Sequence, residues 1–198
     1  MKKYFLLIPA LLSTVLVLAQ DFKADITTAR TSYSSNKLED AHFALQQALS
    51  ELDIIIGKEV LKLLPEKMDA ATVNTKDDHV TSNAGFIGAT VHRSYAMPNK
   101  VQIEIISNSP MVATLNSFLN MPILGGMMRD ENTKTIKIQG YKARQERQAT
   151  ADENKFNYVI QIPFNNALLT FTVYDSKEDE ATKLINTLPL QQIAKLVQ

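Results

Sequence analysis

The stretch KFNYVIQIPFNNALLTFTVYD, residues 155–175, constrains the fold more than any other part of the sequence. Apolar residues occupy every second position on both sides of Asn165 and Asn166: Phe156, Tyr158, Ile160 and Ile162 before the pair, and Leu169, Phe171 and Val173 after it. Alternate residues of a strand point to the same face, and asparagine tolerates the left-handed backbone of a tight turn. We therefore predict an antiparallel hairpin whose apolar face must be covered by other structure.

Further strands and helices are predicted around this hairpin. Residues 88–95 and 101–107 form a second strand pair across the turn MPNK, and another strand carries Ile136 and Ile138. Ser109 and Pro110 begin a helix, and the C-terminal helices are interrupted at Pro189. The polar run at 141–155 is predicted to be the end of an edge strand followed by a loop. Residues 73–198 are thus expected to be α+β, with an antiparallel sheet of about five strands and helices on one face.

Residues 20–66 are predicted to form a helical hairpin that docks on this sheet as part of one cooperative unit. The long second helix has apolar residues three or four positions apart, namely Leu38, Ala41, Leu45, Leu49, Leu52, Ile56, Val60 and Leu63. Pro65 ends it, and Gly57 is expected to weaken it by about 1 kcal/mol. We predict that Leu49 and Leu52 are buried against the sheet.

Residues 1–19 have the three parts of a secretory signal peptide. Lys2 and Lys3 precede an apolar run from Phe5 to Leu18, and small residues lead to a cleavage site after Ala19. We predict export to the periplasm or the exterior of a bacterial cell, with no transmembrane segment after cleavage. The chain has no cysteine, which excludes a cysteine-linked lipid anchor, disulfides and thiol nucleophiles.

The charge balance argues against nucleic-acid binding. The 21 basic and 21 acidic residues give a formal net charge of +0 and are interspersed along the chain. Nucleic-acid binding requires a basic surface that neutralises phosphates, and the sequence has no sustained basic face.

The progression from VQIEIISNSP through a helix to KTIKIQGYKA, followed by a hairpin and a terminal helix, resembles small exported bacterial α+β proteins of uncharacterised function. It also resembles the Mog1/PsbP-like fold. The resemblance covers about residues 86–198 and implies an α+β fold for that region. It brings no catalytic motif and no functional residue.

Motifs for catalysis or metal binding are weak. His92 and Ser94 share one face of a strand, but the sequence contains no G-x-S-x-G elbow, so we predict polar residues on the outer sheet face instead of a hydrolase site. Asp77, Asp78 and His79 lie in the run KDDH, which we predict to be a solvated loop instead of a metal site. No cofactor is predicted.

The segment LNMPILGGMMRD, residues 119–130, is the main candidate site. It follows a helix whose predicted apolar face comprises Met111, Leu115, Phe118 and Leu119. Three interpretations remain open: a cap on the sheet core, an apolar patch for a partner or lipid-like ligand, and a thioether site for cuprous ion that uses methionine sulfur. The candidate binding residues are Met121, Ile123, Leu124, Met127 and Met128, and the candidate copper ligands are Met111, Met121, Met127 and Met128.

The leading hypothesis is a non-enzymatic binding or accessory protein of the bacterial envelope, whose partner is an unknown protein or an apolar ligand. The alternatives are a periplasmic metal-handling protein and an enzyme of unrecognised type.

Overall fold

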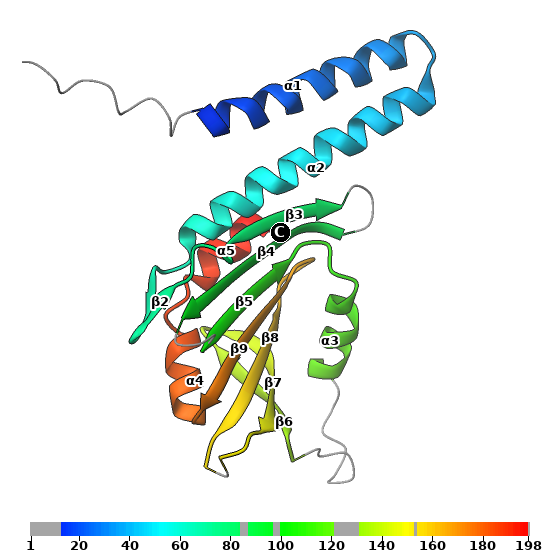
Figure 1. Cartoon of the computed structure of the whole chain (residues 1–198). Helices are drawn as coiled ribbons and strands as arrows, with labels where there is room; N and C mark the ends of the chain where they lie inside the picture. The colour runs from blue at the N-terminus through cyan, green and yellow to red at the C-terminus, as the bar shows by residue number, and fades with distance from the viewer. Residues whose placement is uncertain (1–12, 84–86, 97–99, 121–130, 153, 198) are drawn as a thin grey trace, which may run out of the picture.

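The computed structural model describes residues 13–83, 87–96, 100–120, 131–152 and 154–197. Two long helices come first and pack against each other as an antiparallel hairpin (Figure 1). A mixed region of strands and helices follows. The elements are α1 (Ser13–Ser34), α2 (Leu38–Leu63), β1 (Lys67–Met68), β2 (Ala71–Val73), β3 (His79–Asn83), β4 (Ile87–Ala96), β5 (Val101–Ile106), α3 (Met111–Asn120), β6 (Thr133–Ile138), β7 (Tyr141–Ala149), β8 (Phe156–Pro163), β9 (Leu168–Ser176), α4 (Glu178–Ile185) and α5 (Leu190–Val197).

The strands form one antiparallel sheet, which confirms the predicted mixture of helices with an antiparallel sheet. Its order is β1-β2-β4-β5-β9-β8-β7-β6, and β3 pairs with β4 beside β2. The sheet has nine strands, so the prediction of about five was wrong. Part of the excess comes from residues 67–83, where β1, β2 and β3 are short and have little apolar alternation.

The polar run that begins at Tyr141 also forms a full strand. β7 pairs with β6 on one side and with β8 on the other, so the predicted edge-strand end was wrong for residues 141–149, and the predicted loop is confined to the residues between β7 and β8. Gln139 and Gly140 have positive φ angles of 49° and 90° and make the two-residue turn between β6 and β7. Only Ala143 and Gln145 of β7 are buried, which explains why its sequence lacks an apolar pattern.

The core lies on one face of the sheet. Val101, Ile103 and Ile105 of β5 are fully buried, and they pair in register with Val173, Phe171 and Leu169 of β9. This confirms the apolar faces that were predicted from alternation. Helices α4 and α5 and the C-terminal half of α2 cover this face and contribute to the same apolar cluster.

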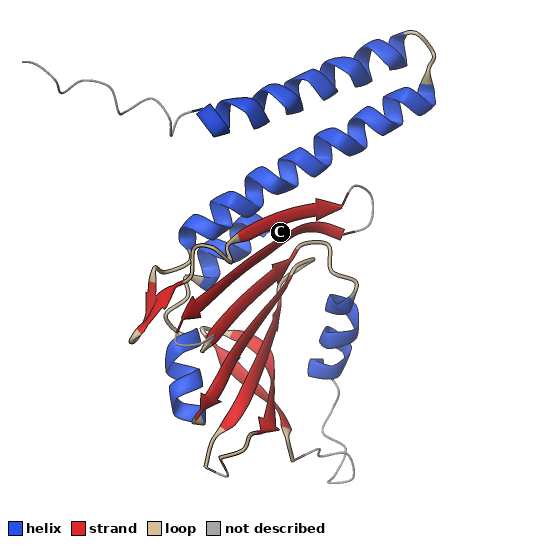
Figure 2. Ribbon diagram, in the orientation of Figure 1, coloured by secondary structure: helices blue, strands red, loops and turns tan. Residues whose placement is uncertain are grey.

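Helix α3 lies on the opposite face of the sheet (Figure 2). Val112, Leu115 and Leu119 of α3 pack on Leu168, while the neighbouring Leu169 belongs to the main core. Adjacent residues of a strand point to opposite faces. The prediction that the helices cover one face was therefore wrong for α3.

At Gly57, α2 lies close against the sheet. A β-carbon at this position would lie 2.5 Å from Cγ1 of Val80 and 3.2 Å from Cγ2 of Val91. The glycine that the sequence marked as a weak point of the helix therefore permits close contact with β3 and β4.

Candidate functional site

The segment that the sequence singled out gives no site geometry. Met121, Ile123, Leu124, Met127 and Met128 lie outside the described residues, and so do the copper ligands predicted beside Met111. Met111 itself opens α3 with 55% of its surface exposed.

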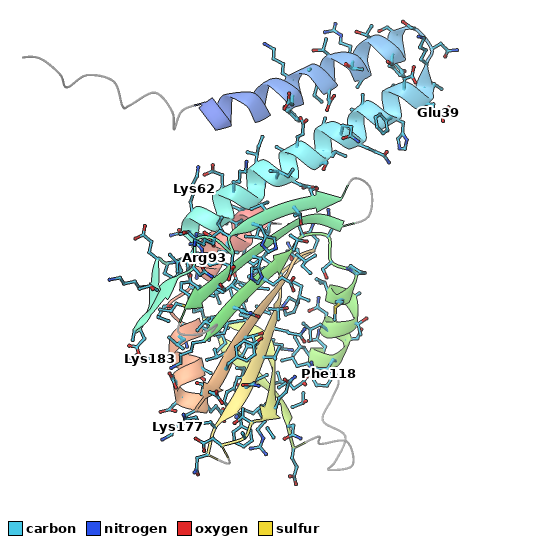
Figure 3. All side chains as sticks on the ribbon, viewed as in Figure 1. Glu39, Lys62, Arg93, Phe118, Lys177 and Lys183 are labelled. Carbon is cyan, nitrogen blue, oxygen red and sulfur yellow. The ribbon has the colours of Figure 1, made fainter. Side chains whose placement is uncertain are left out.

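The predicted apolar face of α3 is correct in part. Leu115 and Leu119 are buried, but Met111 and Phe118 are exposed. The third buried residue of this helix is Val112, which packs with the two leucines on Leu168. The Phe118 ring lies under the guanidinium of Arg144, whose carbon is 5.7 Å from the ring centroid. Figure 3 shows Phe118 on α3 beside the sheet.

His92 and Ser94 do not form a nucleophile–base pair. The Ser94 hydroxyl is buried and donates to Oδ2 of Asp77 over 2.6 Å. The His92 ring stacks on His79 of the neighbouring strand, with centroids 4.8 Å apart. Each side chain has a different partner, so this pair has no arrangement for nucleophilic catalysis.

The KDDH run is a loop at residues 76–78, as predicted, but Asp77 and Asp78 bond to side chains of β4 instead of being fully solvated, and His79 begins β3. Asp78 accepts two hydrogen bonds from Arg93, at 3.0 Å from Nε and 2.6 Å from Nη2. The alternative metal site gains no support, because no group of three or more His, Cys, Asp or Glu side chains within the described residues could hold an ion.

Arg93 joins this loop to the end of α2. It donates to the carbonyl oxygen of Leu64 over 2.9 Å, and the Tyr95 hydroxyl donates to that of Pro65 over 2.6 Å. Burial opposes the charged form of Arg93, yet Asp78 raises its pKa overall; burial also raises the pKa of Tyr95 to about 12. Both side chains therefore stay protonated and hold the C-terminus of α2, where unpaired carbonyls attract donors.

Four exposed leucines lie along the N-terminal half of α2. We call this set the leucine stripe, and its members Leu38, Leu45, Leu49 and Leu52 are 59%, 47%, 61% and 38% exposed. Because a helix turns about 100° per residue, these four positions fall within about 60° of one another. The prediction that Leu49 and Leu52 are buried against the sheet was wrong.

The reason lies in the two apolar faces of α2. Ala41, Ala44 and Ala48 are buried, and they occupy a face roughly 80° around the helix from the leucine stripe. Helix α1 packs on α2 with its own buried Ala29, and small side chains on both helices allow close approach. The alanine face thus receives α1, while the leucine stripe extends past the sheet with its side chains exposed to solvent (Figure 1).

The same part of the hairpin is acidic. Residues 21–53 contain six acids and three bases, and within the described chain none of these six carboxylates has a basic group within ion-pair distance. Burial, together with the negative charges of Asp25 and Asp21, raises the pKa of Glu51. One carboxylate oxygen of Glu51 is buried without a hydrogen-bond partner.

No protein-family model matches the chain, and a search of curated proteins found no match either. Within the part of the chain that the structure describes, no helix is long and apolar enough to cross a membrane.

The sequence already contained the signal for the leucine stripe. Residues 38–63 carry an alanine face and a leucine face side by side, and a single neighbouring helix covers only one of them. What the sequence did not indicate is which face the chain itself covers.

Proposed function

We propose that this protein is an exported, non-enzymatic binding or accessory protein of the bacterial envelope that binds another protein through the leucine stripe. The observation that carries the proposal is the exposure of four leucines on one side of a helix whose alanine face packs on α1. Contiguous exposed apolar surface of this kind is typical of sites where a protein binds a partner.

Export rests on the N-terminal pattern, and the hairpin is compatible with it. Cleavage after Ala19 would leave α1 beginning at Gln20. The buried Ala29 and the half-buried Phe22 and Asp25 of α1 lie beyond this point. The mature chain would therefore keep these three residues of α1.

Site-specific photo-crosslinking in the intact envelope tests the proposal. A photoreactive phenylalanine analogue is placed at Leu49 in the stripe or, as the matched control, at Phe43. Phe43 is 62% exposed on the same helix but points away from the stripe, about 140° from Leu38.

We expect Leu49 to give a discrete adduct with a protein that mass spectrometry identifies, and Phe43 to give none of that adduct. Equal labelling at both positions, or no protein adduct at Leu49, would contradict the proposal.

A further inference from the structure

The spacing of the leucine stripe is that of a coiled-coil seam. Leu38, Leu45 and Leu52 are seven residues apart, and Leu49 follows Leu45 by four. Such alternating three- and four-residue steps align side chains along the line where a second helix packs. His42 falls on the same line, four residues after Leu38, and is exposed. A polar residue at one seam position fixes the register of a partner helix.

The charges beside the seam favour one kind of partner. Glu39 and Asp53 lie next to it on α2, on the side away from α1. Glu39 marks the end of the hairpin farthest from the sheet, whereas Lys62 lies near the sheet (Figure 3). Since the carboxylates of residues 21–53 lack ion-pair partners in the described chain, basic side chains along an incoming helix would complement them.

We infer that the leucine stripe binds an amphipathic helix of a partner protein whose apolar face is flanked by lysine and arginine. The inference rests on the proposed function and specifies the class of partner. The incoming helix would lie along α2 next to α1, so that three helices bury a common apolar line. Leucine side chains would supply the buried area, and the acidic residues would select the partner by charge.

The same charges disfavour two other occupants. Antiparallel pairing with a second copy would place Leu38 opposite Leu52 of the other chain, which brings Glu39 close to Asp53. Parallel pairing would place each acid beside its own counterpart. Both arrangements set like charges against each other. Bacterial membrane surfaces are anionic, and helices that lie on them carry lysine and arginine on their polar face, unlike this hairpin.

Binding of designed peptides to the full exported chain tests the inference. Two synthetic helices share one leucine seam, but one carries lysine and arginine at the flanking positions and the other carries glutamate. Fluorescence anisotropy at low salt gives their dissociation constants. We expect the basic helix to bind about tenfold or more tightly than the acidic one, and added salt to reduce the difference.

Matched variants assign the binding to the stripe and its charges. Leu45→Ser with Leu49→Ser should abolish binding of the basic helix, whereas Phe43→Ser should leave it unchanged. Glu39→Gln, beside the seam, should weaken it, whereas Asp40→Asn, about 160° around the helix from Leu38, should not. All of these side chains are exposed, so thermal unfolding of the variants should match the parent.

The other outcomes overturn the inference in distinguishable ways. Equal affinity for both helices would refute the charge selection. Failure of both helices to bind, alongside a protein adduct at Leu49, would refute the helical partner and leave the proposed function standing. Dimerisation that the double serine variant abolishes, measured by light scattering, would identify a second copy as the occupant. Binding to anionic phospholipid vesicles that depends on Leu45 and Leu49 would identify a membrane surface.

Discussion

The two halves of α2 carry the same kind of apolar pattern but have different surroundings. In the C-terminal half, Gly57 lies close to the sheet and Val60 is 0% exposed. In the N-terminal half, Leu38 and Leu49 repeat the pattern at about 60% exposure. The difference teaches that helical periodicity defines a face without defining what covers it. Where this chain provides no cover, we propose that a partner does.

The covered half is also anchored by polar contacts. Arg93 and Tyr95 donate to the carbonyls of Leu64 and Pro65, directly after α2, and Asp78 accepts hydrogen bonds from Arg93 in turn. These contacts fix the direction in which the hairpin leaves the sheet. The exposed leucines therefore extend from a firmly attached base, which favours presentation to a partner.

The largest effect is expected where the end of α2 is attached to the sheet. Asp78→Ala removes the partner of Arg93 and should lower the free energy of unfolding by about 2–3 kcal/mol, measured by urea denaturation. The expected loss is smaller than for a fully buried ion pair, because the side chains of Arg93 and Asp78 are 10% and 13% exposed. The double replacement Arg93→Met with Asp78→Leu should recover part of the loss. A loss below about 0.5 kcal/mol would show that the Arg93–Asp78 pair does not anchor the end of α2 to the sheet.

A smaller effect separates the two halves directly. Val60→Ala truncates a fully buried side chain and should lower the free energy of unfolding by about 2 kcal/mol. Leu49→Ala, a larger truncation on the same helix, should change it by less than about 0.5 kcal/mol because the side chain is exposed. Similar losses from both changes would mean that the leucine stripe is covered in solution and would remove the contrast between the halves.

Much of the fold was predictable because its core strands alternate strictly. The buried faces of β5, β8 and β9 follow from period-two patterns that only one register satisfies. The strands that escaped prediction lack this signal. β1 has two residues, and β7 is a polar strand in which only Ala143 and Gln145 are buried. Their positions depend on pairing with neighbours, which a local pattern does not encode.

The candidate site was less predictable for a related reason. The leucine stripe was visible as periodicity, but its exposure depends on the length of α2 relative to the sheet that it crosses. The polar residues of KDDH were likewise visible, but their role depends on Arg93, which lies 15 residues after Asp78. In both cases the missing information is tertiary.

The smallest effect concerns the contact between α1 and α2, which holds the uncovered half in place. Burial and the nearby Asp25 and Asp21 raise the pKa of Glu51 above its usual value of 4.5. The folded chain therefore binds the Glu51 proton more tightly than the unfolded chain does. Any stability from this group is fully present below the unfolded pKa and is lost as pH rises through the folded pKa.

Glu51→Gln removes this titration and keeps the shape of the side chain. We expect the variant to be more stable than the parent at neutral pH, and the gain to shrink as pH falls through the folded pKa towards 4.5. Thermal unfolding of both proteins across this range measures the difference. Asp40→Asn, exposed on the same helix and without an ion-pair partner in the described chain, controls for the loss of one negative charge. If the parent instead gains stability relative to the glutamine variant as pH rises, the charged form of Glu51 is stabilised by a favourable partner. Burial and the neighbouring aspartates would then not destabilise the Glu51 carboxylate.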